Sequence, residues 1–197
     1  MWEGLSTRLA GDVVVLEPLS RAHEPALFDA ARASDWSLMS VTATESPEAF
    51  GAWLEAALIE AEAGREAPFA TLSRATGEPI GSTRYLSLRP EHRSLEIGWT
   101  WLASTAWNSG ANIEAKLLML EHAFERLGCL RVEFKTDALN ERSRRALAAL
   151  PAQFEGVFRK HMVVRGGERR DSAWYAIVDD DWPVVRANLE RRLAARR

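Results

Sequence analysis

The stretch WNSGANIEAKLLMLEHAFERLG, from Trp107 to Gly128, decides the fold of this chain. It opens with a short polar turn that contains one glycine, and a strongly periodic segment follows directly. The apolar residues of that segment recur at the spacing of one helical face. They are Ile113, Leu117, Leu120, Phe124 and Leu127. We therefore predict a helix over residues 113–127 that packs against the core and ends at Gly128.

The polar turn before this helix is compatible with two interpretations. The first N–H groups of a helix have no partner within the helix and carry a partial positive charge, and a glycine lets the chain bring them close to a phosphate. The residues that permit this approach are Ser109, Gly110, Ala111 and Asn112. In the other interpretation, the side chain of Asn112 caps the helix and the turn binds nothing. The turn alone does not decide between them.

Further strands and helices are predicted on both sides of this segment. Runs of β-branched or alternating apolar residues predict strands at residues 13–19, 69–73, 80–88, 95–102, 130–136, 157–164 and 173–178. Capping residues and helical spacing predict further helices at residues 23–33, 47–63, 140–150 and 184–195. Ser46 and Asn140 are the expected N-caps of the second and third of these. The order of elements predicts a mixed α+β fold, which we expect to form one domain over residues 1–197.

The composition is that of a soluble globular protein, with 47% hydrophobic and 27% charged residues. No apolar run is long enough to cross a bilayer, and the N-terminal residues lack the apolar core of a signal peptide. Cys129 is the single cysteine, which excludes an internal disulfide and suits a reducing compartment. We interpret Cys129 as a small apolar strand residue. The expected location is the cytoplasm, without a membrane partner.

The charges are distributed unevenly around a net charge of -3. Residues 126–170 carry eleven Lys or Arg and five Asp or Glu, whereas residues 41–80 carry two Arg and seven Glu. A nucleic-acid-binding protein would need a broad basic surface, so we expect no nucleic-acid partner. The basic half suits a small polyanionic ligand, or else a solvated surface with scattered charge. Histidine and cysteine do not cluster at metal-ligand spacing, so we expect no metal.

Several strings along the chain form a set that is more specific than any one of them. They are VVLEPL at 14–19, GSTRY at 81–85, EIGWTWL at 96–102, WNSGANIEAK at 107–116, HAFERLG at 122–128, RVEFKTDALNERS at 131–143 and RRDSAWYAI at 169–177. Together with the element order, this set resembles the GNAT superfamily of acetyl-coenzyme A-dependent N-acetyltransferases. Within it, the chain is most similar to the branch of the N-terminal acetyltransferases of ribosomal proteins, the Rim-type enzymes. The resemblance covers about residues 13–183.

The resemblance implies a GNAT-type mixed central sheet of about seven strands, splayed at the middle and flanked by helices. Acetyl-CoA would lie in the gap between the strands at 95–102 and 130–136. Its pantetheine arm would bond to main chain near Trp99, Thr100 and Trp101, and its pyrophosphate would sit on the turn from Ser109 to Asn112. The resemblance also places Asn140 beside the thioester. Arg145, with Arg142 and Arg144, would lie near the terminal phosphates.

The implied reaction moves an acetyl group from acetyl-CoA to a primary amine of a small molecule or a protein N-terminus. Direct attack through a tetrahedral intermediate needs no enzyme nucleophile. Glu96 is the expected general base, directly or through a water, because it lies on the strand that would deliver the acetyl group. Its alternative interpretation is an exposed strand residue paired with Arg84 or Arg93. Main-chain N–H groups around Trp99 would polarise the thioester carbonyl.

Three side chains are candidates for the remaining proton transfers. Ser143 is the leading acid for the departing thiolate, by its match to the family's serine, and Tyr175 is the alternative acid. Ser143 would otherwise only bond to Asn140 in the first turn of its helix. His161 is a candidate second base or substrate contact. The expected acceptor pocket consists of Trp36, Met39 and Tyr85.

The turn departs from the family's pattern at two positions. Trp107 stands where the family has Arg or Gln, and Asn112 replaces a last Gly or Ala. These changes favour an alternative function, a non-catalytic GNAT-fold protein that senses acetyl-CoA or acts as an assembly partner. Pro151 follows the helix at 140–150 where a glycine is common, so we expect a changed helix end there. The last helix and an exposed strand edge could pair two copies of the chain as a homodimer.

Overall fold

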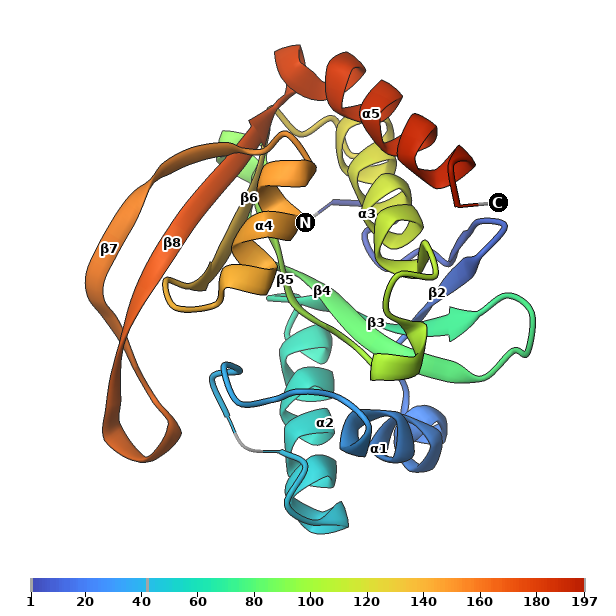
Figure 1. Cartoon of the computed structure of the whole chain (residues 1–197), viewed down its shortest axis with the longest axis vertical. Coiled ribbons are helices and arrows are strands. Elements are labelled where there is room, and N and C mark those ends of the chain that lie inside the picture. The colour runs from blue at the N-terminus through green and yellow to red at the C-terminus, as the bar shows by residue number, and fades with distance from the viewer. Residues whose placement is uncertain (1, 42, 197) are drawn as a thin grey trace.

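One sheet runs through the part of the chain described by the computed structural model, residues 2–41 and 43–196 (Figure 1). Eight strands in those residues follow the order β1-β2-β3-β4-β5-β6-β8-β7. They are β1 (Leu9–Ala10), β2 (Val14–Pro18), β3 (Ala67–Ser73), β4 (Pro79–Arg89), β5 (Ser94–Leu102), β6 (Arg131–Asp137), β7 (Gln153–Val164) and β8 (Glu168–Val178). The β5–β6 pair is parallel and the other neighbours are antiparallel. The predicted mixed sheet is confirmed, with the two-residue β1 added at one edge.

The helices cover both faces of this sheet and enclose two hydrophobic cores. They are α1 (Glu24–Arg32), α2 (Pro47–Glu62), α3 (Ala111–Glu121), α4 (Glu141–Ala149) and α5 (Trp182–Ala194). Figure 1 shows α1 and α2 on one side of the sheet and α3 and α5 on the other. Apolar residues of α3 and α5 enter the larger core, and those of α1 and α2 form the second.

Local capping rules account for two helix starts. The side chain of Ser46 accepts a hydrogen bond from the N–H of Ala49 (3.1 Å), and Pro47 occupies the first position of α2. The side chain of Asn140 accepts one from the N–H of Ser143 (3.0 Å) and starts α4 in the same way. Both predicted N-caps are confirmed.

The predicted helix over residues 113–127 differs from the observed one at both ends. α3 begins two residues earlier, at Ala111, and the segment His122–Arg126 winds as a π-helix instead of an α-helix. The wider turn is closed by a hydrogen bond from the N–H of Leu127 to the carbonyl of His122 (2.9 Å). Gly128, with φ of +67°, ends the segment as predicted.

The C-terminal hairpin is longer than its apolar pattern predicts. β7 begins at Gln153 and β8 at Glu168, ahead of the expected starts at residues 157 and 173. Arg170 and Ser172 are buried on β8 although they are polar, so a search for apolar alternation misses them. Pro151 follows Leu150, the C-cap of α4, and the changed helix end expected there stays a prediction.

The predicted splay of the sheet lies between β5 and β6. The two strands pair only from Ser94 to Glu96 on β5, opposite Arg131 to Glu133 on β6. Beyond Glu96, β5 stays paired with β4 and β6 stays paired with β8, so the two strands diverge. A β-bulge adds to this divergence, because Trp99 and Thr100 together stand opposite Thr83. Trp99 takes a φ of +50° at this bulge.

A buried carboxylate ties α3 to the beginning of β2. Glu114 accepts hydrogen bonds from the N–H groups of Asp12 (2.9 Å), Val13 (2.6 Å) and Val14 (2.7 Å). Gly11 lies against the same carboxylate, and a Cβ atom at this position would come within 2.3 Å of it. These hydrogen bonds therefore fix the first turns of α3 to the start of β2.

Candidate active site

A cavity of about 500 Å³ occupies the splay between β5 and β6. Its walls come from both strands, the turn before α3, the N-terminal part of α3, most of α4, the C-terminal part of α5, the loop between α1 and α2, and single residues of β4, β7 and β8. The predicted site residues on these walls are Glu96, Trp99, Thr100, Trp101, Gly110, Asn112, Asn140, Ser143 and Met39. The structure therefore brings most of the predicted site together around one space.

Glu96 lies at the point where β5 and β6 part, and its side chain is 2% exposed. One of its oxygens accepts hydrogen bonds from Lys135 Nζ (2.9 Å) and Ser87 Oγ (3.1 Å). Burial raises the pKa of this carboxyl above its usual value, and Lys135 and Ser87 act against that rise. Neither arginine of the alternative interpretation contacts it, because Arg84 pairs with Glu66 and Arg93 bonds to a main-chain carbonyl.

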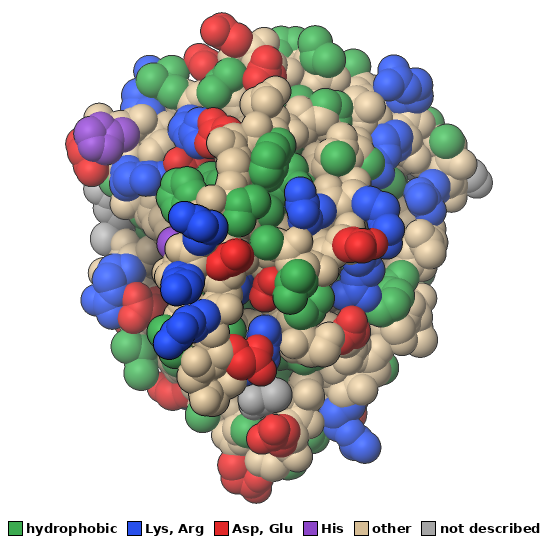
Figure 2. Space-filling model, turned by 60° about the vertical axis from the view of Figure 1, so that its left-hand side comes forward, with side chains coloured by type: hydrophobic (Ala, Val, Ile, Leu, Met, Phe, Trp, Pro, Cys, Tyr) green, Lys and Arg blue, Asp and Glu red, His purple; other side chains and the backbone are tan. Residues whose placement is uncertain are grey.

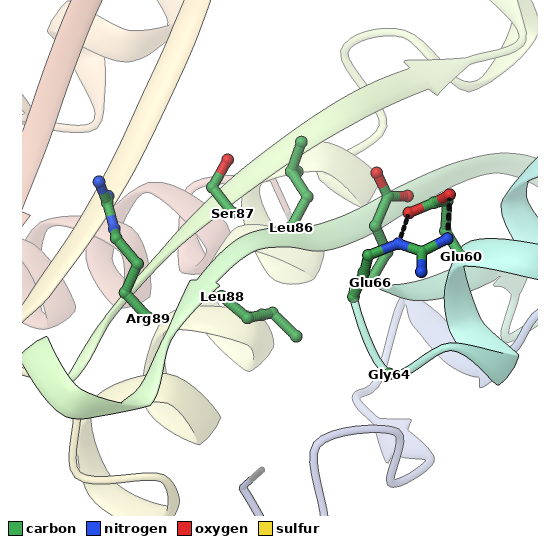
Figure 3. Close-up of a pocket in the computed structure, with 8 residues that line it drawn as sticks. Glu60, Gly64, Glu66, Leu86, Ser87, Leu88 and Arg89 are labelled. Atoms are coloured by element: carbon green, nitrogen blue, oxygen red, sulfur yellow. Dashed lines mark hydrogen bonds and ion pairs between the residues drawn. The ribbon is translucent and has the colours of Figure 1, made fainter.

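A second hollow, of about 430 Å³, lies between the end of α2 and β4 (Figure 3). The Arg65–Glu60 ion pair borders it (2.6 Å), and Ser87 and Leu86 line its wall. Leu86 also lines the larger cavity. Because Ser87 donates to Glu96, one hydrogen bond separates the carboxylate from this second space.

Neighbouring side chains contact both aromatic rings at the bulge on β5, and the guanidinium of Arg84 lies 4.9 Å from the centroid of the Trp99 ring. The ring of Trp101 belongs to an aromatic cluster and lies 5.3 Å from that of Trp36, centroid to centroid. The hydroxyl of Thr100 is within 2.8 Å of the hydroxyl of Thr83. A bulge leaves strand N–H and C=O groups without ladder partners, so residues 99–101 can offer them to a ligand.

Two residues with positive φ shape the turn before α3. Gly110 has a φ of +91° and Asn108 a φ of +61°. The hydroxyl of Ser109 accepts a hydrogen bond from the N–H of Ala111 (3.2 Å) and donates to the carbonyl of Ala106 (2.7 Å). The first helical bond runs from the N–H of Glu114 to the carbonyl of Gly110. The N–H groups of the residues before Glu114 therefore have no carbonyl partner within the helix, as at any helix N-terminus. No side-chain hydrogen bond from Asn112 caps α3.

Arginines surround the mouth of the cavity near this turn. The guanidinium of Arg142 stacks on the ring of Trp107, 4.2 Å from its centroid, so the residue that replaces the family's cation itself holds one. Arg192 of α5 and Arg196, which lies beyond the end of α5, also line the cavity, and Arg196 donates to the carbonyl of Asn108 (2.5 Å). The predicted Arg145 has a largely exposed side chain that pairs with Glu141 (3.2 Å) and lies outside the wall.

Lys116 is a buried residue of the cavity wall that the sequence analysis missed. Its Nζ donates to Thr100 Oγ1 (2.8 Å), and among the described residues no carboxylate forms an ion pair with it. Burial lowers the pKa of this amine from 10.5 to about 7. A signal was present, because Lys116 is spaced three residues after Ile113 and four before Leu120 and therefore lies on the apolar face.

Replacing Lys116 with Met is expected to stabilise the protein more at pH 6 than at pH 10. The folded-state pKa lies below the unfolded value, so the unfolded chain binds more protons between about pH 7 and 10.5, and stability falls as the pH drops through that range. Removing the amine abolishes this penalty, which is on the order of several kcal/mol at acidic pH. Urea unfolding at both pH values would measure the difference. The exposed Lys160, replaced by Met, is the control, and an equal gain from both variants would contradict the prediction.

Only some of the residues predicted for the acceptor pocket line the cavity. Met39 lines it together with Ser34, Asp35 and Leu38 of the same loop. Trp36 is 4% exposed and packs against Trp53 and Trp101, away from the wall.

Tyr85 also lies in the core rather than in the cavity. It is fully buried, and its hydroxyl donates to the carbonyl of Met119 (2.7 Å). The expected acceptor pocket therefore keeps Met39 and loses both aromatic residues, because packing in the two cores holds their rings elsewhere.

The other candidate acids and bases differ in whether they line the cavity. Ser143 lies on the cavity wall. Tyr175 is 4% exposed, packs against Phe154 and accepts a hydrogen bond from Arg144 Nε (3.2 Å). The imidazole of His161 lies within 3.0 Å of the hydroxyl of Ser172, and it is not on the wall either. Of the two predicted acids, only Ser143 faces the cavity.

Three further features concern metal binding, membrane-spanning helices and the distribution of charge on the surface. Among the described residues, no group of three or more His, Cys, Asp or Glu is placed to hold a metal ion. In the same residues, no helix is long and apolar enough to span a bilayer. On the face that Figure 2 shows, basic, acidic and hydrophobic side chains are interspersed rather than gathered into one basic surface.

Comparisons with known proteins agree with this architecture. The chain matches the sequence model of the acetyltransferase (GNAT) domain over residues 14–153. A T. thermophilus protein, provisionally described as an acetyltransferase, is 41% identical; the match covers 98% of this chain and 100% of that chain, with a TM-score of 0.87. The RimJ of Mycobacterium smegmatis, solved in complex with CoA-disulfide, is 23% identical and shares the fold, with a TM-score of 0.79 over 99% of this chain and 97% of that one.

One curated relative matches a shorter segment. The uncharacterized N-acetyltransferase YoaA of Bacillus subtilis is 32% identical over 105 residues, which are 53% of this chain and 58% of that protein. The chain thus spans less than two thirds of the length of this relative.

Proposed function

Since the chain belongs to the GNAT acetyltransferase family, we propose that it transfers the acetyl group of acetyl-CoA to a primary amine. The observation that carries the proposal is the buried Glu96 at the opening of the β5–β6 splay, on the wall of the 500 Å³ cavity. A carboxylate with a raised pKa in such a space is suited to take a proton from an amine.

The residues around the cavity fit acetyl-CoA. The bulge at Trp99 and Thr100 can bond a pantetheine amide as a further strand would, and the amides after Gly110 can hold a pyrophosphate. Arg142 on Trp107 supplies the cation that the turn sequence lacks. Asn112 belongs to the wall without closing the cavity. In support, M. smegmatis RimJ, which shares this fold, was solved with a CoA derivative.

Acetyl-CoA, when bound, supplies the acetyl group as a thioester. Glu96 takes a proton from the acceptor amine, and the route through Ser87 to the second hollow returns that proton to solvent. The main-chain N–H groups around Trp99 would donate hydrogen bonds to the thioester carbonyl oxygen and stabilise the charge that develops on it.

Two residues of the wall act on the leaving sulfur. Lys116, with a pKa of about 7, can donate a proton to it at neutral pH. Ser143 donates a hydrogen bond from the first turn of α4, and Asn140 fixes that turn by accepting the N–H of Ser143. This assignment adds Lys116 to the acid expected from the sequence.

Thermal unfolding with and without acetyl-CoA tests the cofactor proposal. Ligand at about a hundredfold its dissociation constant adds ~2.7 kcal/mol, which raises the Tm of a protein of this size by about 5–10 °C. Arg142→Gln should reduce the shift, whereas Arg159→Gln, an exposed arginine on β7, should not. No shift at millimolar acetyl-CoA would contradict the proposal and favour the alternative of an assembly partner.

Several other expectations stay predictions. They are the single domain over residues 1–197, the cytoplasmic location, the homodimer and the choice between a small-molecule and a protein acceptor. Gel filtration with light scattering would measure the oligomeric state.

A further inference from the structure

We propose that Arg170 binds a carboxylate of the acceptor, so that the substrates are amines that carry a carboxylate close to the amine. This inference rests on the proposed acetyl transfer and names the class of its acceptor. Arg170 lies on β8 opposite Met162 of β7, beyond the open end of the splay, and lines the same cavity as Glu96. This is the end of the cavity to which the acceptor loop, residues 34–40, also contributes.

Arg170 is buried without an anionic partner. It is 8% exposed, and in the described part of the chain it forms no ion pair within 4.0 Å. Its Nη1 donates to the hydroxyl of Ser40 (3.0 Å), and its buried Nε has no hydrogen-bond partner among the residues that the structure describes. A guanidinium in this state is costly unless a ligand completes its bonds.

The nearby carboxylates are already engaged. Glu96 bonds to Lys135 and Ser87. Asp137 accepts the N–H of Leu139 (2.9 Å) and lies 3.7 Å from Arg165. They contribute to the field at Arg170, but neither bonds to it.

A second buried arginine, Arg84, has the carboxylate partner that Arg170 lacks, although its Nε and Nη2 also have no hydrogen-bond partner among the described residues. Arg84, 4% exposed, pairs with Glu66 (2.9 Å) and lies between the rings of Trp53 and Trp99, about 5.0 and 4.9 Å from their centroids. Arg170 has no comparable partners, and it faces the cavity. The planar fork of its guanidinium matches a carboxylate, which is why we assign that group rather than an apolar one.

The test compares matched acceptors that differ only in the carboxylate. One series pairs free amino acids with their carboxamides, and a second pairs tripeptide amides that begin with Asp or Glu with those that begin with Asn or Gln. Each compound is scored by thiol release with acetyl-CoA and by the thermal shift that it causes in the CoA-loaded protein. We expect the carboxylate member to be favoured by about tenfold or more in at least one series, which also tells a free amino acid from a peptide end.

Variants assign the preference to Arg170. Arg170→Met should abolish it without lowering the Tm, because the variant removes a buried charge that has no anionic partner among the described residues. The neighbouring exposed Arg169, replaced by Met, should keep the preference. Equal responses to both members of every pair, or a preference that survives Arg170→Met, would overturn the proposal.

Binding of acetyl-CoA separates the two proposals. If acetyl-CoA shifts the Tm and no carboxylate preference appears, acetyl transfer stands and the role of Arg170 falls. If acetyl-CoA gives no shift, acetyl transfer falls. The thermal shifts caused by carboxylates and amides in the free protein then still decide whether Arg170 binds an anion.

Discussion

Replacing Glu96 with Gln is expected to lower the turnover number by about 10²–10⁴-fold with little change in acetyl-CoA binding. The amide keeps the size of the side chain but cannot take a proton from the amine. In the wild type, activity should fall as the pH drops through the raised pKa of Glu96, because the base must be ionised to act. This acid limb should be absent from the residual activity of the variant. Thiol release at saturating amine over a range of pH would measure both effects.

A matched control separates loss of the base from loss of charge. Glu91 is an exposed glutamate in the turn between β4 and β5, shortly before Glu96 in the sequence, and Glu91→Gln should leave turnover unchanged. If Glu96→Gln retained wild-type turnover together with the acid limb, another group would be the base. Asp137, the other buried carboxylate of the wall, would then be the next residue to replace.

Replacing Glu114 with Gln is expected to destabilise the fold by about 3 kcal/mol or more. The carboxylate accepts three main-chain N–H groups at the start of β2, and hydrogen bonds to a charged group contribute about 1.5–3 kcal/mol each. A glutamine offers one oxygen and turns its NH₂ group toward at least one of these donors, which leaves a buried N–H without a partner. The Tm should fall by about 6–12 °C in calorimetry.

The control for this prediction lies on the same helix. Glu121 ends α3 and meets Arg186 at 3.4 Å near the surface, so Glu121→Gln should change stability by less than about 1 kcal/mol. Equal effects of the two variants would show that the three amide bonds do not hold α3 in place.

Elements that depend on local rules were predictable from the sequence. Ser46 and Asn140 cap their helices as their residue types require, and Gly128 ends its segment with a positive φ. The splay next to Glu96 was predicted from resemblance rather than from local pattern. The cavity lies in this splay, and most of the site residues predicted from the resemblance line it.

The missed residues depend on contacts between distant segments. Lys116 and Arg170 carry charges into buried positions because the splay exposes one face of α3 and β8 to the cavity. An alternating strand pattern shows that Thr83 and Tyr85 share a face, but not that this face meets Met119 of α3 instead of a ligand. A search for apolar periodicity ignores a lysine on the apolar face of a helix, although here Lys116 lies on the wall of the candidate active site.

Three residue pairs, from Ser94 to Glu96, are the described pairing between β5 and β6 at the middle of the sheet. The sheet therefore has two parts, β1–β5 and β6–β8, and these three residue pairs are the described strand pairing between them. A molecule bound across the gap would contact both parts and add to the restraint that their shared hydrophobic core already provides. The opening that admits a ligand thus makes the stiffness of the whole sheet depend on whether the gap is filled.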